Sequence, residues 1–115
     1  MSSTSTITIK IQLDKNKHPE SIVWNASDNP EGNKDIECKA MMLSLFEKVH
    51  LDTFKLDLWT KEMQIAEMDR FVFQSLRALA DSYYQATKNA DLANAMRSFV
   101  DYFGENTGIL VPEKE

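Results

Sequence analysis

Cys38 and His50 are the side chains in this sequence best able to form a nucleophile and base pair. A thiolate and an imidazole act together only within hydrogen-bond reach, about 3 Å. The strands predicted below place His50 in a turn and Cys38 near the far end of the preceding strand, roughly 25 Å away at the rise of an extended chain. We therefore interpret Cys38 as a buried structural cysteine, and the sequence predicts no catalytic residue.

Metal binding is the second chemistry to consider, because His18 and His50 both fall in predicted turns beside Asp14 and Asp52. In an up-and-down sheet these turns would lie at the same end. The sequence has no pair of histidines at i and i+4 and no CxxC spacing, and the acidic loop 28–35 lacks the ligand order of a calcium loop. We interpret the two histidine-containing segments as solvated turns, and we predict no metal site and no cofactor.

Period-two alternation of apolar residues indicates the strands that must position these groups. The alternation is clearest in Ile7, Ile9, Ile11 and Leu13, and a turn with Pro19, which we expect to stop pairing, leads to a second strand. The local pattern of ECKAMMLSLF fits either a helix or a strand. The alternating segment TFKLDLWT that follows reads as a strand and needs a pairing partner close in sequence, so we interpret the earlier segment as a strand too. The predicted strands are Thr6–Asp14, 21–27, Lys39–Phe46 and 53–60.

From about Gln64 the apolar period becomes helical. Asn89 is a predicted N-cap for a second helix, and Gly108 is a natural stop. The two apolar stripes consist of Ile65, Met68, Val72, Leu76, Leu79 and Tyr83, then Leu92, Met96, Phe99 and Phe103. We predict the α+β class, with a four-stranded antiparallel sheet followed by two amphipathic helices packed on one face. The expected organisation is a flexible N-terminus at 1–5, one domain at 6–108 and a C-terminal tail at 109–115.

Composition limits the functions open to this chain. Its 115 residues include 13 basic and 18 acidic side chains, a net charge of −5 that repels nucleic acid and anionic lipid. One cysteine allows no internal disulfide. No window has the roughly 18 consecutive apolar residues of a membrane span, and the first residues do not form a signal peptide. We expect a cytoplasmic protein without membrane insertion.

One group of residues indicates a protein interface. If the helices cover one face of the sheet, Val23, Met42, Phe46 and Trp59 point away from them, among polar side chains. Adjacent large apolar residues on a surface mark interaction sites, although a register shift of one residue would invert this assignment. These four residues are the predicted interface.

Five phrases together resemble the GldC family of gliding motility-associated proteins of the Bacteroidota. In chain order they are TITIKIQLDKNKHPESIVWNASD, KAMMLSLFE, LDLWTKEM, EMDRFVFQSLRALADSYYQAT and MRSFVDYFGENTG. The resemblance implies a noncatalytic cytoplasmic accessory role in gliding motility, through contacts with other proteins of the apparatus. A homo-oligomer is possible. The alternative is a chaperone-like polypeptide-binding module, suggested by the order of four strands before two helices, which is an analogy of fold alone.

Overall fold

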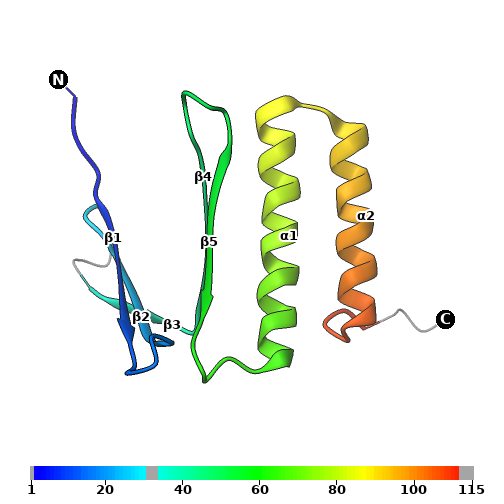
Figure 1. The fold of residues 1–115 in the computed structure, drawn as a ribbon. Helices are drawn as coiled ribbons and strands as arrows, with labels where there is room; N and C mark the ends of the chain where they lie inside the picture. The colour runs from blue at the N-terminus through cyan, green and yellow to red at the C-terminus, as the bar shows by residue number, and fades with distance from the viewer. Residues whose placement is uncertain (1, 31–33, 112–115) are drawn as a thin grey trace. The chain divides into compact units, whose positions relative to one another are not determined.

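The computed structural model describes residues 2–30 and 34–111 and forms two compact units, Met1–Met63 and Gln64–Glu115. All strands lie in the first unit and both helices in the second (Figure 1). The elements are β1 (Ile7–Leu13), β2 (Pro19–Ala26), β3 (Ile36–Cys38), β4 (Ala40–Phe46), β5 (Thr53–Trp59), α1 (Ile65–Thr87) and α2 (Ala90–Asn106). The predicted α+β class is confirmed.

The predicted domain at 6–108 and the packing of the helices on one face of the sheet stay predictions. Of the predicted flexible segment 1–5 and tail 109–115, Met1 and residues 112–115 lie outside the described residues, as do residues 31–33 of the acidic loop. Residues 2–6 have no regular secondary structure, and the Ser5 hydroxyl donates a hydrogen bond to the Asp28 carboxylate.

β1 and β2 form the predicted antiparallel hairpin, with Ile9 opposite Trp24. The expectation that Pro19 stops pairing is wrong, because β2 begins at this residue, opposite Leu13. Proline is tolerated at the first position of a strand, where its missing N–H interrupts no ladder. The register shifts between Gln12 and Leu13, so the irregularity lies beside the turn.

The predicted sheet of four strands is two sheets in the structure, in the orders β1-β2-β3 and β4-β5. The segment 36–46 changes partner at Lys39. Before this residue, Cys38 of β3 lies opposite Ile22 of β2. At Lys39 the carbonyl oxygen accepts hydrogen bonds from the backbone N–H of Thr60 (2.8 Å) and from its hydroxyl (3.2 Å). The third predicted strand is therefore β4, preceded by the short β3 that the sequence analysis missed.

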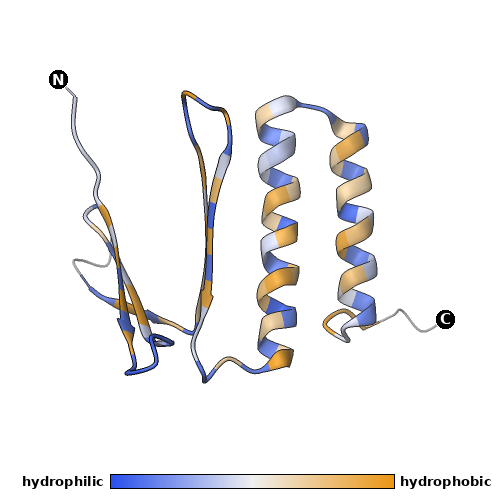
Figure 2. Ribbon diagram, viewed as in Figure 1, coloured by the Kyte–Doolittle hydropathy of each residue, from blue (hydrophilic) through white to orange (hydrophobic). Residues whose placement is uncertain are grey.

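The β4–β5 hairpin separates its side chains into two faces, as the alternation predicts. Apolar and polar positions follow one another along both strands (Figure 2). The apolar face is half-buried except at Leu45 and Phe54, which are exposed beside the turn. Its members are Met41, Leu43, Leu45, Phe54, Leu56 and Leu58. The opposite face carries Ala40, Met42, Ser44, Phe46, Thr53, Lys55, Asp57 and Trp59.

Both helices begin at residues whose side chains replace missing backbone partners. Gln64 and Glu67 form a capping box at α1, where the N–H of Gln64 donates to the Glu67 carboxylate (3.0 Å). The predicted N-cap Asn89 is confirmed, since its side chain accepts from the N–H of Leu92 (3.1 Å). Gly108, at φ 79°, follows the end of α2 as expected for a helix stop.

Small residues make the contact between α1 and α2. Ala80, Ala93 and Val100 are buried, together with Phe73 and Gly104. The predicted apolar stripes lie beside this seam and stay partly exposed, with Phe99 at 54%. Periodicity located the apolar side of each helix, but the size of the side chains decides which positions allow the close approach.

Gly104→Ala is expected to destabilise the helical unit. A Cβ at this position would lie 2.6 Å from Phe73 Cε1 and 2.8 Å from two carbons of Leu110, a crowding that typically costs about 1–3 kcal/mol. An uncrowded glycine in a helix would respond with the opposite sign, a gain of about 0.5–1 kcal/mol. Urea unfolding measures the difference.

The matched variant combines Gly104→Ala with Phe73→Leu, which removes the nearest ring atom. We expect the double variant to lose less free energy of unfolding than the sum of the losses in the two single variants. Stabilisation by Gly104→Ala alone would contradict the close packing of the seam.

Candidate functional site

The structure places the four predicted interface residues in three locations. Val23 lies in β2, opposite Lys10 of β1 and Glu37 of β3, so it belongs to a different sheet from the others. Phe46 lies at the turn end of β4, and it is 68% exposed. Trp59 ends β5 at the other end of the same face, six ladder steps or roughly 20 Å from Phe46.

Met42 is the predicted residue that lies near Trp59. It stands opposite Asp57 in the ladder and therefore diagonal to Trp59, within reach of a large side chain. Both are exposed, Trp59 at 56%. An ion pair between Lys55 Nζ and Asp57 Oδ1 (2.7 Å) separates this pair from Phe46. Of the four predicted residues, Met42 and Trp59 are neighbours, whereas Val23 and Phe46 lie apart from them, and a protein interface at these residues stays a prediction.

A mostly apolar cavity of about 280 Å³ opens beside Trp59, and we call it the Trp59 groove. Its apolar wall comes from Pro19, Leu58 and Trp59, and its polar groups come from the two connections that meet there. The lining residues are His18, Pro19, Asp57, Leu58, Trp59, Thr60 and Lys61.

The groove joins segments about 40 residues apart because of the change of partner at Lys39. Cys38 lies opposite Ile22, and Ala40, two residues further, lies opposite Trp59. β2 runs antiparallel to β3, so two residues past Cys38 on one strand correspond to two residues before Ile22 on the other, which is the start of β2. The turn before β2 therefore lies level with the end of β5. Sequence reasoning found Trp59 from local alternation, but no local signal pairs it with Pro19.

Asp14 and Lys61 hold the two sides of the groove together. Lys61 Nζ lies 2.8 Å from Asp14 Oδ2, and the Asp14 side chain is only 13% exposed. Its other oxygen accepts hydrogen bonds from the backbone N–H groups of Asn16 (2.8 Å) and His18 (3.0 Å). One carboxylate therefore shapes the turn and links it to Lys61, two residues after the end of β5.

These contacts favour the ionised form of Asp14. The hydrogen bond from Lys61, followed by that from the His18 backbone, lowers the pKa of Asp14 to about 2 from an ordinary 3.8. The same carboxylate raises the pKa of Lys61. Both groups therefore stay charged through the neutral range, and the connection keeps its charge there.

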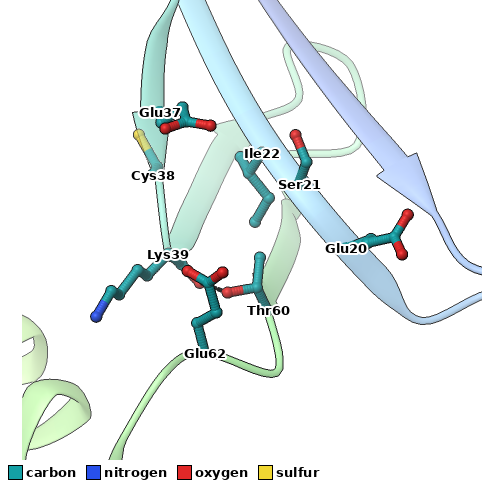
Figure 3. Close-up of a pocket in the computed structure, with 8 residues that line it drawn as sticks. All are labelled: Glu20, Ser21, Ile22, Glu37, Cys38, Lys39, Thr60 and Glu62. Atoms are coloured by element: carbon teal, nitrogen blue, oxygen red, sulfur yellow. Dashed lines mark hydrogen bonds between the residues drawn. The ribbon is translucent and has the colours of Figure 1, made fainter.

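A second cavity, of about 300 Å³, is lined by Glu20, Ser21, Ile22, Glu37, Cys38, Lys39, Thr60 and Glu62 (Figure 3). Ile22 and Thr60 are buried and point toward one another, while the Lys39 side chain extends away from them. Cys38 is half-buried, and its thiol donates a long hydrogen bond to the carbonyl of Ile36 at 3.8 Å. Most of the residues that line this cavity are polar, and they come from β2, from β3 and from the segments next to Lys39 and Thr60.

The two histidines lie at opposite ends of β5. His18 lines the Trp59 groove, whereas His50 sits in the β4–β5 turn, its Nδ1 3.4 Å from Glu47 Oε1. The backbone N–H of His50 also donates to Glu47, and this hydrogen bond lowers the pKa of the Glu47 carboxyl. Within residues 2–30 and 34–111, no three His, Cys, Asp or Glu side chains group in a way that could hold a metal ion.

Comparison with known families gives one match. The model of the family described as gliding motility-associated protein GldC-like matches residues 19–109, which is most of the chain. The matched region contains β2 through α2 and every residue that lines the Trp59 groove except His18. No curated protein and no solved structure matches the chain. In the part of the chain that the structure describes, no helix has the length and apolar character needed to span a membrane.

Stability is expected to fall in acid as Asp14 takes up a proton. Its folded pKa of about 2 lies below the unfolded value of about 3.9, so its contribution is present above pH 4 and is lost as the pH falls toward 2. Asp14→Asn should remove this part of the pH dependence. Thermal midpoints by circular dichroism between pH 2 and 6 measure it.

The useful quantity is the difference between the wild-type and Asp14→Asn midpoints at each pH. Glu47 also has a lowered pKa, but it titrates in both proteins and cancels in this difference. The difference should shrink steadily below pH 4. A difference that stays constant across the range would show that the Asp14 carboxylate does not stabilise the fold.

Proposed function

Since the chain belongs to the GldC-like family of gliding motility-associated proteins, we propose that it is a noncatalytic accessory protein of gliding motility. It acts in the cytoplasm by binding other proteins of the motility apparatus. Family membership supplies the cellular process. The binding role and its location on the surface rest on the geometry around Trp59.

The observation that carries the binding role is the exposed Trp59 beside a mostly apolar groove. Tryptophan is among the residues that most often dominate the energy of protein interfaces, particularly beside a pocket that excludes water. Pro19 and Leu58 form the apolar wall, and the Asp14–Lys61 ion pair holds the wall in place. A preformed groove costs less ordering on binding than a flexible one.

The noncatalytic character is supported by the placement of the reactive side chains. Cys38 ends β3, while His50 lies beyond the far end of β4, so the length of β4 separates the thiol from the imidazole. Nucleophilic catalysis needs the two within hydrogen-bond reach. The cysteine is better explained by its position in the sheet, opposite Ile22.

A chaperone-like polypeptide-binding module is the second candidate. The Trp59 groove favours it because an open apolar groove would also accept an apolar side chain of an unfolded chain. The two candidates differ in specificity. A chaperone protects several unrelated unfolded proteins from aggregation, whereas an accessory protein captures one or two native partners.

Trp59→Ser is expected to abolish partner capture while the chain stays folded. Loss of an interface tryptophan typically costs 2 kcal/mol or more, so affinity should fall by roughly 30-fold. Phe46→Ser is the matched control, since it removes an aromatic that is at least as exposed from the far end of the same hairpin face. Crosslinking pull-down from the native cell and a circular dichroism melt on each variant make the comparison.

The proposal requires partners that Phe46→Ser retains and Trp59→Ser loses at similar melting temperatures. If Trp59→Ser unfolds, Met42→Lys tests the same site from the diagonal position in β4. Retention of every partner by both Trp59→Ser and Met42→Lys would exclude the groove. Protection of several unrelated unfolded proteins by the wild-type chain, lost in Trp59→Ser, would favour the second candidate.

A further inference from the structure

β1 is an outer strand of its sheet, in the order β1-β2-β3, and one side of its backbone faces away from β2. Residues of an antiparallel pair alternate between those that exchange hydrogen bonds with the neighbour and those that point away. The N–H of Ser27 donates to the carbonyl of Thr6 (2.9 Å), which identifies Thr6 and Ser27 as a hydrogen-bonded pair. In the recorded register, Thr8 and Lys10 therefore also bond toward β2.

The backbone groups that point away from β2 consequently belong to Ile7, Ile9 and Ile11. Three β-branched residues favour an extended strand, and Ile7 is 69% exposed. Natural proteins commonly protect outer strands with charges or proline at such positions. These three positions have neither, and Lys10 is the one charged residue in β1.

β5 provides the contrast within the same unit. Thr60 bonds to Lys39, so the residues of β5 whose backbone points away from β4 include Lys55 and Asp57. Both are charged and paired with one another at 2.7 Å, which is the usual protection of a strand edge. β1 has a single charge, Lys10, whose backbone points toward β2 and whose Nζ lies 4.0 Å from Asp35 Oδ2.

We propose that β1 pairs antiparallel with β1 of a second copy of this chain, centred on Ile9, so that two three-stranded sheets join into one. This register is self-complementary. Ile9 faces Ile9 of the second copy and Ile7 faces Ile11, and these are the residues with outward backbone groups. On the other side of the sheet, Thr8 faces Lys10.

Charge selects this register over its neighbour. A pairing centred on Lys10 would set two ammonium groups directly opposite one another, which is unfavourable. The centre at Ile9 avoids this contact and sets Lys10, whose Nζ lies 4.0 Å from Asp35 Oδ2 of its own chain, opposite the neutral hydroxyl of Thr8. β1 also contains no acidic residue, so the net charge of −5 of the whole chain is not concentrated where the copies meet. This inference concerns a different surface from the Trp59 groove and does not depend on it.

Ile9→Pro tests the edge directly. Proline removes an N–H that points away from β2, so the hairpin hydrogen bonds stay intact while the pairing between copies loses its centre. Sedimentation velocity over a concentration series should show a dimer for the wild-type chain and a monomer for Ile9→Pro. A wild-type chain that stays monomeric, or an Ile9→Pro dimer of unchanged affinity, would overturn the proposal.

Two substitutions at Thr8 test the register without disturbing the backbone. In the proposed pairing residue 8 faces Lys10 of the second copy, twice per dimer. Thr8→Glu should therefore tighten dimerisation and Thr8→Lys should weaken it, each by roughly 2- to 30-fold. Adding Lys10→Glu to Thr8→Lys creates an opposite-charge pair again and should tighten dimerisation beyond the wild type, as Thr8→Glu does. Equal effects of Thr8→Glu and Thr8→Lys would exclude this register, and this test holds even if Ile9→Pro does not fold.

Discussion

The hydrogen bonds from Thr60 to the carbonyl of Lys39 are the contact on which the strand unit depends. At Cys38 the chain is a partner of β2, and one residue later it is a partner of the segment that ends β5. Thr60 is buried, and beside it lies Ile22, the most buried large side chain among the described residues. The Thr60 hydroxyl is buried with its hydrogen bond to Lys39 made, which is the condition for burying a hydroxyl without a penalty. Two hairpins are thereby joined at a single residue.

The Trp59 groove is a consequence of this junction. Because the chain changes sheets at Lys39, the first residues of β2 pair with β1 but not with β3, and they come level with the end of β5. Asp14 and Lys61 occupy that position with opposite charges, and the backbone of the turn supplies further donors to Asp14. The Asp14 side chain is only 13% exposed and has these further hydrogen bonds, whereas the Lys61 side chain is 70% exposed, so the contacts of Asp14 with its own turn contribute most of the order here. The groove wall thus belongs to the fold and does not require a ligand to form.

The fold that the sequence predicted is the part governed by local periodicity. Alternation identified β1, β2, β4 and β5, and the helical period with an Asn89 cap identified α1 and α2. β3 was missed because three residues are too short to establish a period, and the separation into two sheets depends on which distant strand each half of 36–46 meets. The site divides in the same way. Alternation placed Met42 and Trp59 on one face of the β4–β5 hairpin. His18 and Pro19 line the Trp59 groove because of how the two hairpins are joined at Lys39, which no local pattern predicts.

Residue size explains why the apolar stripes lie beside the seam between the two helices and not in it. A hydropathy pattern weights Phe99 above Ala93, yet only the smaller residue lets two helices approach closely. Ala93, Val100 and Gly104 therefore face α1, and Phe99 remains half-exposed, stacked on Tyr102 with ring centroids 6.2 Å apart. The same distinction separates β1 from β5. Both are outer strands with alternating apolar residues, but the parity of the hydrogen bonds puts charges on the outward positions of one and isoleucines on those of the other. The hydropathy pattern does not tell which residues of a strand have backbone groups that point away from the neighbouring strand. In β1 this is fixed by one hydrogen bond, from the N–H of Ser27 to the carbonyl of Thr6.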